Sequence, residues 1–247
     1  MAKTTASTGK AASTGKTAST GKTAPTRKAP QRSPAPGKAG VKARAASPKA
    51  RKFKDKALRA PAVKARVIKS EVVYTGPLFR VTKDRIVEPD GNKSTRDVVR
   101  HNGSVVIMAI DATSSRKDPW IVMERQYRHA ANSYLWELPA GKLDPGEEPL
   151  AGAQRELEEE TGYRAKKWKP LVEYYASPGF LGESMKVYVA EGLTPGQTNF
   201  DEDENIELRL VKLSDVIKLI YSGEVLDGKT MGCILYYANL KKKARKA

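Results

Sequence analysis

One short stretch, residues 141–163, constrains the fold more strongly than any other part of the chain, and it reads GKLDPGEEPLAGAQRELEEETGY. Pro149 suits the first turn of a helix, where its missing N–H costs nothing, and Gly162 suits the position just past a helix end. Between them stand good helix formers such as alanine, leucine and glutamate. The stretch therefore predicts a loop followed by a helix over residues 150–161.

Glutamates gather on one face of this predicted helix. Glu156, Glu159 and Glu160 stand at positions i, i+3 and i+4, so their side chains share a face. Like charges at these spacings repel each other and destabilise a helix unless something neutralises them. Carboxylate oxygens are hard ligands, so Mg²⁺ or Mn²⁺ is the obvious neutraliser. The pattern indicates a divalent metal site, which would stabilise developing phosphoryl charge and help to deprotonate a water molecule.

A run of glutamates taken alone favours a different interpretation, a solvated acidic helix face. The residues around the run decide against it. Gly141 is followed by five residues, Glu147, seven further residues and then the sequence RELEEETGY, which begins at Arg155. This spacing fills every fixed position of the Nudix box, G-x5-E-x7-R-E-U-x-E-E-x-G-U, in which U is aliphatic or aromatic. The chain therefore resembles the Nudix hydrolases.

This resemblance implies an α/β fold, specifically an α/β/α sandwich with a mixed sheet, and hydrolysis of a nucleoside diphosphate linked to a further group. By the family pattern Glu156, Glu159 and Glu160 hold the metal, and the carbonyl of Ala140 is an extra ligand. The implied cofactor is Mg²⁺, with Mn²⁺ as the alternative. The box is silent about the substrate, because it handles only the shared diphosphate.

The other box residues are interpreted as scaffold for this site. Glu147 and Arg155 are expected to pair, which would tie the loop to the helix. Gly141 is expected to permit the turn, and Leu157 is expected to face the core. In the family pattern Glu147 and Arg155 also belong to the catalytic set, together with Glu159.

Residues outside the box resemble the ADP-ribose pyrophosphatase branch of the family. Pro178 stands sixteen residues after Gly162, within a Ser-Pro-Gly sequence, and a glutamate follows in the same loop. The branch resemblance implies hydrolysis of ADP-ribose, and of other ADP-sugars, to AMP and a sugar phosphate. It runs from about residue 71 to residue 240 and includes the segments 124–128, 136–141 and 201–204 and the Asp-Gly-Lys-Thr sequence at 227–230.

The branch resemblance also assigns roles to this loop. Glu183 becomes the general base, or an alternate metal ligand, in a mobile loop that closes to bring it within reach of a water. Ser177, Pro178 and Gly179 become substrate contacts, although Pro and Gly at these positions also fit a simple turn. The branch often has Ser-Asp or Thr-Asp before the glutamate. This chain instead has Leu-Gly at 181–182, which leaves the contacts of the loop open.

Two arginines match positions at which the branch holds the nucleotide or its phosphates. They are Arg96 and Arg128, whose planar guanidinium groups suit phosphate oxygens and also stack on bases. Surface arginines without such a role are the alternative. Two other functions stay open for the whole chain: a diphosphatase for another nucleotide sugar, such as GDP-mannose, and a non-catalytic nucleic-acid-associated scaffold. The scaffold would be expected to have lost box glutamates, and none is missing.

The first quarter of the chain has a different composition. Residues 1–70 contain nineteen lysines or arginines against one acid, Asp55, a balance of +18, so residues 71–247 sum to −1 within the total of +17. The segment 1–68 is low in apolar residues and repeats Ala-Ser-Thr-Gly-Lys, so we predict a disordered basic tail. We expect this tail to contact nucleic acid without sequence specificity, with solubility or tethering as alternatives.

The rest of the chain is expected to be one Nudix domain over residues 69–241, followed by a short basic tail at 242–247. Residues 72–100 read as a β-rich subdomain with a hairpin turn at Pro89–Asn92. In the branch that this chain resembles, that portion commonly contributes to a swapped homodimer, so we expect a dimer. Strands are predicted at 104–110, 120–124, 171–175, 185–190 and 206–213, and further helices at 214–222, with a serine cap, and 230–241.

The sequence also bears on compartment. No apolar run approaches a membrane span, and no apolar segment follows Met1 as in a signal peptide. Cys233 is the single cysteine, which excludes an intramolecular disulfide and suits a reducing compartment. We therefore expect a cytoplasmic protein without a membrane partner, with Cys233 as a buried thiol and the basic tail as a route to the nucleoid. An organelle transit peptide is the weaker alternative for the tail.

Overall fold

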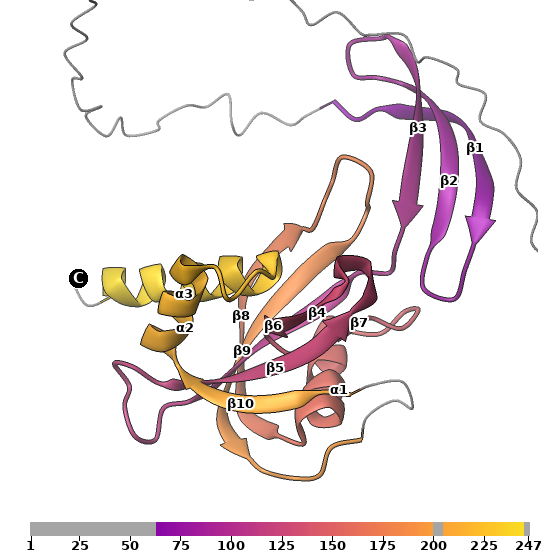
Figure 1. Ribbon diagram of the computed structural model, residues 1–247. Coiled ribbons are helices and arrows are strands. Elements are labelled where there is room, and N and C mark those ends of the chain that lie inside the picture. The colour runs from indigo at the N-terminus through magenta and orange to yellow at the C-terminus, as the bar shows by residue number, and fades with distance from the viewer. Residues whose placement is uncertain (1–62, 200–204, 245–247) are drawn as a thin grey trace, which may run out of the picture. The chain divides into compact units, whose positions relative to one another are not determined.

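The computed structural model describes residues 63–199 and 205–244, so residues 1–62 of the tail predicted over 1–68 lie outside the described residues. The described part contains ten strands and three α-helices (Figure 1). In chain order the elements are β1 (Arg66–Thr75), β2 (Arg80–Val87), β3 (Lys93–Arg100), β4 (Ser104–Asp111), β5 (Trp120–Arg128), the 3₁₀ helix η2 (His129–Ala131), β6 (Ser133–Glu137), β7 (Ala140–Lys142), α1 (Pro149–Thr161), β8 (Arg164–Tyr175), β9 (Ser184–Thr194), β10 (Glu207–Lys212), α2 (Leu213–Ser222) and α3 (Gly228–Ala244).

The first three strands form an antiparallel sheet of their own, in the order β1-β2-β3. The predicted hairpin turn is confirmed, because Gly91 has a φ of +91° and the N–H of Glu88 donates to the carbonyl of Asn92 at 2.8 Å. The sheet starts earlier than predicted. β1 begins at Arg66, so the predicted boundaries at residues 68 and 72 both fall inside a strand and are wrong. Every residue of β1 is exposed, so the strand lacks the apolar alternation that would have marked its start.

The remaining strands form one seven-stranded sheet. Its main path runs β10-β5-β4-β9-β8, while β6 pairs with β5 and β7 pairs with β4. The pairing of β4 with β9 is parallel and the others are antiparallel, so the predicted mixed sheet is confirmed. Since β4 is bordered by β5, β7 and β9, it is the central strand and carries the core.

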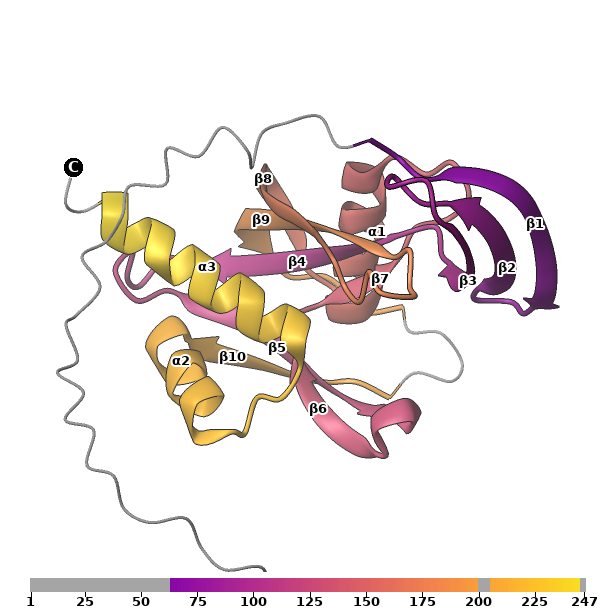
Figure 2. The ribbon, with the colours of Figure 1, turned by 90° about the horizontal axis from the view of Figure 1, so that it is seen from above.

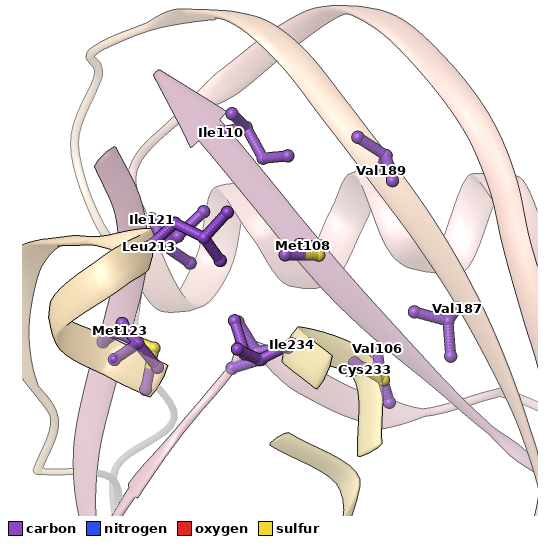
Figure 3. Packing of buried hydrophobic residues seen from close by; sticks show 12 residues of the cluster. Val106, Met108, Ile110, Ile121, Met123, Val187, Val189, Leu213, Cys233 and Ile234 are labelled. Carbon is purple, nitrogen blue, oxygen red and sulfur yellow. The ribbon is translucent and has the colours of Figure 1, made fainter. Parts of the chain in front are cut away.

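Helices cover both faces of this sheet (Figures 1 and 2). Seven consecutive residues of β4 are buried, which is the pattern of a strand covered on both sides. On one face, alternate β4 residues pack with Leu213 and Val216 of α2 and with Cys233 and Ile234 of α3 (Figure 3). On the other face, the intervening β4 residues pack with Ala153 and Leu157 of α1. This confirms the sandwich and the core positions of Leu157 and Cys233.

The helix ends show where local signals suffice. The predicted first helix is confirmed, with Pro149 in its first turn and Gly162 beyond its end at a φ of +68°. Gly223 ends α2 in the same way, with a φ of +80°. The predicted serine cap of α2 is wrong. Lys212 is the N-cap residue, and Asp118, from the loop before β5, accepts hydrogen bonds at 2.8 Å from both the backbone N–H and the Oγ of Ser214.

Other boundaries also differ from prediction. β8 is longer than predicted. Its first half is an exposed, lysine-rich edge without β-branched residues, so no local pattern indicated a strand there. β6 and β7 were not predicted. α3 runs to Ala244, so the predicted basic tail at 242–247 is wrong over 242–244. Among the helices of residues 63–199 and 205–244, none combines the length and apolarity needed to cross a bilayer.

Candidate active site

A cavity of about 290 Å³ lies where β7 meets α1. Four side chains of α1 line it, from Arg155, Glu156, Glu159 and Glu160, and the three residues of β7 form a further wall. Arg128, at the end of β5, contributes a second cation. The predicted metal ligands therefore line one cavity. We name it the glutamate cavity.

Gly141 allows β7 and α1 to approach each other at this cavity. A Cβ atom placed on Gly141 would lie 1.9 Å from the carboxyl carbon of Glu156, which is closer than any real contact. The expectation that Gly141 permits a turn is wrong, because the residue lies inside β7. The glycine is needed because the strand backbone leaves the space that the Glu156 carboxylate fills.

Arg155 connects the carboxylates of the cavity to the preceding loop. Its Nε and Nη2 atoms donate to the two carboxylate oxygens of Glu147, each at 3.0 Å, which confirms the predicted pair. Its Nη1 atom donates to Glu156 at 2.8 Å and to Glu159 at 2.9 Å. The hydrogen bonds with Glu147 raise the pKa of Arg155 and lower the pKa of Glu147. One guanidinium thus binds three carboxylates and offsets one of their three negative charges.

The donors present suit a hard divalent cation. Glu156 and Glu160 are 8% and 4% exposed, and a cation is already accommodated between Glu156 and Glu159 in the form of the Arg155 guanidinium. Oxygen donors of this kind are the ones Mg²⁺ and Mn²⁺ prefer. Within the described ranges, however, no three acidic, His or Cys side chains are gathered into a preformed metal cluster. The reason is that the carboxylates bind protein donors instead: Glu160 accepts the N–H of Ala140 at 3.0 Å, and Arg155 holds the other two.

Arg128 also lines the cavity, and the buried carboxylate of Glu137 holds it in place. Its Nε and Nη2 atoms donate to the two carboxylate oxygens of Glu137 at 2.8 and 2.9 Å. Burial alone would raise the pKa of Glu137, but the hydrogen bonds from Arg128 and the charge of Lys229 keep that pKa below its ordinary value. Because 37% of the Arg128 side chain is exposed, it retains surface for a ligand. Glu137 was not predicted, since nothing in its local sequence distinguishes it from a surface glutamate.

Glu183 lies apart from the glutamate cavity. Its carboxylate accepts a hydrogen bond from Ser104 Oγ at 2.5 Å and lies 3.8 Å from His101 Nδ1. It is not among the residues that line the cavity. Glu183 is nonetheless linked to the cavity through the sheet. Ser104, which binds Glu183, pairs with Lys142, and Lys142 lines the cavity. Neither Ser104 nor His101 was predicted, and a lone Ser or His carries no sequence signal for such a contact.

The loop that carries Glu183 is joined to β3. The N–H of Val99 donates to the carbonyl of Phe180 at 2.8 Å, and the N–H of Gly182 donates to the carbonyl of Val99 at 2.9 Å. The carbonyl of Ser177 accepts the N–H of Leu181 at 3.0 Å, which closes the loop. Phe180 and Gly182 therefore hydrogen-bond to β3, and Leu181 between them pairs with Val99, so the two positions at which this chain departs from the branch pattern, 181 and 182, lie at this contact.

A second cavity, of about 370 Å³, lies between this loop and β3. Arg96, Pro178 and Gly179 line it, so the structure brings together these three predicted substrate contacts and separates them from Arg128. Arg96 also pairs with Glu88 at 2.5 Å. Sequence reasoning missed the aromatic residues of this loop cavity, Tyr175 and Phe180, which are 60% and 56% exposed. Their position on either side of the Ser-Pro-Gly sequence was the available signal.

A larger cavity, of about 920 Å³, lies elsewhere. It lies at the other end of β4, beside Ile110 and Asp111, and contains none of the predicted site residues. Size alone would favour it as the site. We place the chemistry in the glutamate cavity, because the titratable groups and cations converge there.

Comparison with known proteins agrees with this fold. The family model of the NUDIX domain matches residues 100–229, and the model of the nucleoside diphosphate sugar hydrolase N-terminal domain matches residues 66–99. The chain therefore belongs to the Nudix family, and it is a hydrolase. The boundary between the two models falls at the end of β3, where the two sheets of the structure also divide.

Individual relatives are more specific. The chain is 40% identical over 173 residues to an ADP-ribose pyrophosphatase of Bacillus subtilis (strain 168), covering 69% of this chain and 91% of that protein. It is 33% identical over 164 residues to a GDP-mannose pyrophosphatase of Citrobacter koseri, covering 62% of this chain and 85% of that protein. A solved structure described as an ADP compounds hydrolase shares the fold, with a TM-score of 0.63 and 21% identity over 76% of this chain and 99% of that one.

Proposed function

We propose that this hydrolase cleaves the diphosphate of ADP-ribose, and of other ADP-sugars, to AMP and a sugar phosphate in a Mg²⁺-dependent reaction. The observation that supports this most is the glutamate cavity, in which three carboxylates and two arginines converge between β7 and α1. The identity with an ADP-ribose pyrophosphatase over most of the folded part supports the choice of substrate.

In this proposal Glu156, Glu159, Glu160 and the carbonyl of Ala140 hold the Mg²⁺, with Mn²⁺ as a substitute. The bound cation would supply charge stabilisation to the phosphoryl oxygens and lower the pKa of a water. Arg155 keeps two hydrogen bonds to Glu147 that do not involve the other glutamates. It can therefore release Glu156 and Glu159 and still tie the loop to α1.

The reaction itself needs a nucleophile, an anion site and a proton acceptor. A water oxygen attacks one phosphorus, the bond between that phosphorus and the bridging oxygen breaks, and the electron pair leaves with the second phosphate. The exposed part of Arg128 binds the phosphate oxygens, because a guanidinium forms paired hydrogen bonds to them. Glu183 accepts the proton of the water, with the hydrogen bond from Ser104 Oγ orienting its carboxylate.

The loop cavity is proposed to hold the nucleotide end of the substrate. Arg96 offers a cation, and the exposed rings of Tyr175 and Phe180 offer faces on which a base can stack. Ser177 shapes the loop and, with Pro178 and Gly179, sets the position of these rings.

A homodimer is also proposed, built through the sheet of β1, β2 and β3. Every residue of β1 is exposed, and five of its side chains are large and apolar: Val67, Ile68, Val72, Val73 and Tyr74. An apolar edge strand of this kind favours pairing with another chain. The molar mass in solution should then be twice that of the 27.1 kDa chain.

The basic segment at the start of the chain is proposed to contact nucleic acid by neutralising phosphates, which would associate a cytoplasmic enzyme with the nucleoid. Because β1 begins at Arg66, a truncation that tests this must stop at residue 62 to leave the strand intact. Duplex DNA should bind the full chain more tightly than the chain lacking residues 1–62, and the difference should shrink as salt rises. Equal affinities would contradict the proposal.

GDP-mannose is the second candidate substrate, favoured by the relative from Citrobacter koseri. A substrate panel decides between the two. The kcat/KM values on ADP-ribose, ADP-glucose and GDP-mannose should be measured with Mg²⁺, for the full chain and for the chain lacking residues 1–62. We expect ADP-ribose to lead and the truncation to leave its value unchanged. A higher value on GDP-mannose would refute the proposed substrate and leave the reaction class intact.

A further inference from the structure

The Asp-Gly-Lys-Thr sequence at residues 227–230 forms the start of α3, and the proposed reaction gives it no role. Its side chains are nonetheless engaged. Lys229 Nζ forms an ion pair with the carboxylate of Glu137 and lies 3.2 Å from Asp227 Oδ2. Asp227 Oδ2 accepts hydrogen bonds from the N–H of Thr230 at 2.9 Å and from its Oγ1 at 2.6 Å. Thr230 Oγ1 in turn accepts the N–H of Leu138 at 2.8 Å.

The start of α3 therefore contacts two consecutive residues, Glu137 at the end of β6 and Leu138 just after it, through two different side chains. Lys229 provides a charge, and Thr230 provides a neutral hydrogen bond. Both contacts are dry, because Glu137 and Thr230 are 1% and 0% exposed. A buried carboxylate that loses one of its cations is left with an incompletely compensated charge, which is costly.

Only one of these two contacts leads to the glutamate cavity. The carboxylate that Lys229 binds is the same one that holds Arg128 through two hydrogen bonds at 2.8 and 2.9 Å. Arg128 lines the cavity, whereas Lys229 and Glu137 do not. Glu137 thus lies between a lysine outside the cavity and an arginine inside it, and each cation limits where the carboxylate can sit.

We propose that Lys229 is a positioning residue that acts through Glu137 to fix the guanidinium of Arg128 in the glutamate cavity, where it meets the phosphates of the substrate. This inference rests on the proposed function and deepens it. Lys229 never touches the substrate. Its ion pair with Glu137 holds that carboxylate in one position, so the exposed part of Arg128 keeps one orientation. The substrate then does not pay the entropy of ordering the Arg128 side chain on binding.

A double-mutant cycle tests this route. Lys229→Met keeps the length of the side chain and removes its charge. We expect it to raise the KM for ADP-ribose by about tenfold, with kcat changed by less than about threefold, the pattern of lost uniform binding. Arg128→Ala should raise KM by at least as much. Because Lys229 acts only through Arg128, Lys229→Met should add nothing to KM in the Arg128→Ala background.

Thr230→Val is the matched control. It removes the neutral link to Leu138, keeps the volume of the side chain and leaves the Lys229–Glu137–Arg128 contacts in place. It should lower the Tm, because the N–H of Leu138 loses its acceptor, and leave the KM unchanged. An equal rise in KM for Thr230→Val, or a further rise on adding Lys229→Met to Arg128→Ala, would overturn the proposal and make the lysine merely structural.

A spectroscopic arm separates this inference from the choice of substrate. The Nε–H of Arg128, hydrogen-bonded to Glu137, should give a protected arginine signal in ¹⁵N-correlated NMR spectra of the free protein. The signal should be lost or broadened in Lys229→Met and kept in Thr230→Val. An unchanged signal in Lys229→Met overturns the positioning role. If ADP-ribose is not hydrolysed by the unaltered chain while the signal behaves as expected, the proposed substrate fails and the positioning role stands.

Discussion

The glutamate cavity and the loop cavity are both lined by arginines, but the chain assembles the two cavities in different ways. In the glutamate cavity four of the side chains come from consecutive turns of α1, and Arg155 links three carboxylates on its own. In the loop cavity Arg96 and Pro178 come from segments about eighty residues apart in the sequence, joined by backbone hydrogen bonds at Val99. The first site is built by helix periodicity, and the second exists only once two sheets have come together.

The largest expected effect tests the first of these sites. Glu159→Gln and Glu160→Gln should each lower kcat by about a thousandfold at saturating Mg²⁺, because each removes charge from the proposed metal ligands. The fold should be retained, as judged by circular dichroism and Tm. The matched control is Glu158→Gln on the same helix, since Glu158 pairs with Arg164 away from the cavity. Near-normal turnover in both cavity variants would refute the metal assignment.

The second prediction concerns Glu183, which is not among the residues that line either cavity. Glu183→Gln should lower kcat by about a hundredfold if its carboxylate accepts the proton of the water. Ser104→Ala serves as the companion variant and should lower kcat by less, since it removes only the hydrogen bond to the carboxylate. A full-rate Glu183→Gln enzyme would transfer the role to Glu159.

The third prediction is about the approach of β7 to α1. Gly141→Ala should reduce kcat/KM by about tenfold or more, because the new methyl group meets the Glu156 carboxylate at 1.9 Å and displaces it. Gly232→Ala, inside α3, is the control. A Cβ atom there has no atom within 4 Å, so the change should be neutral or slightly stabilising. Unchanged kinetics in Gly141→Ala would show that the position of Glu156 does not matter.

The smallest expected effect is a dependence of stability on pH. The folded pKa of Glu137 lies below its ordinary value of 4.5, so its ionised form contributes stability above pH 4.5 that is lost as the pH falls through the folded pKa. The Tm should therefore decline below pH 4.5. Glu137→Gln should be less stable at neutral pH and show a flatter decline across that window. An identical slope in both proteins would show that other groups cause the decline.

Sequence alone predicted the parts of the molecule that depend on near neighbours. The helix over α1, the pairing of Glu147 with Arg155 and the hairpin turn at Gly91 all follow from spacings of a few residues. The central strand was predicted from its β-branched residues, Val105, Val106, Ile107 and Ile110. Family resemblance supplied the sandwich, which no local pattern could define.

What sequence missed depends on distant partners. Asp118 rather than Ser214 caps α2, and those two residues are 96 positions apart. Gly141 was interpreted as a turn residue because its true constraint, the Glu156 carboxylate, approaches only after β7 and α1 have packed. The separation of Arg96 from Arg128 likewise follows from the arrangement of sheets, and the two residues look equivalent in the sequence. Short strands such as β7 carry too few residues to show a periodicity.

The ion pairs of Arg155 have a consequence for how such an enzyme would be kept in a cell. Because the guanidinium already binds Glu147, Glu156 and Glu159, these three carboxylates have a protein partner before any cation is added. Loading with Mg²⁺ then resembles an ion exchange, in which the arginine leaves two carboxylates as the metal enters. Chelation should stop turnover without unfolding the protein, so that the supply of metal would regulate the activity of the enzyme and leave its amount unchanged.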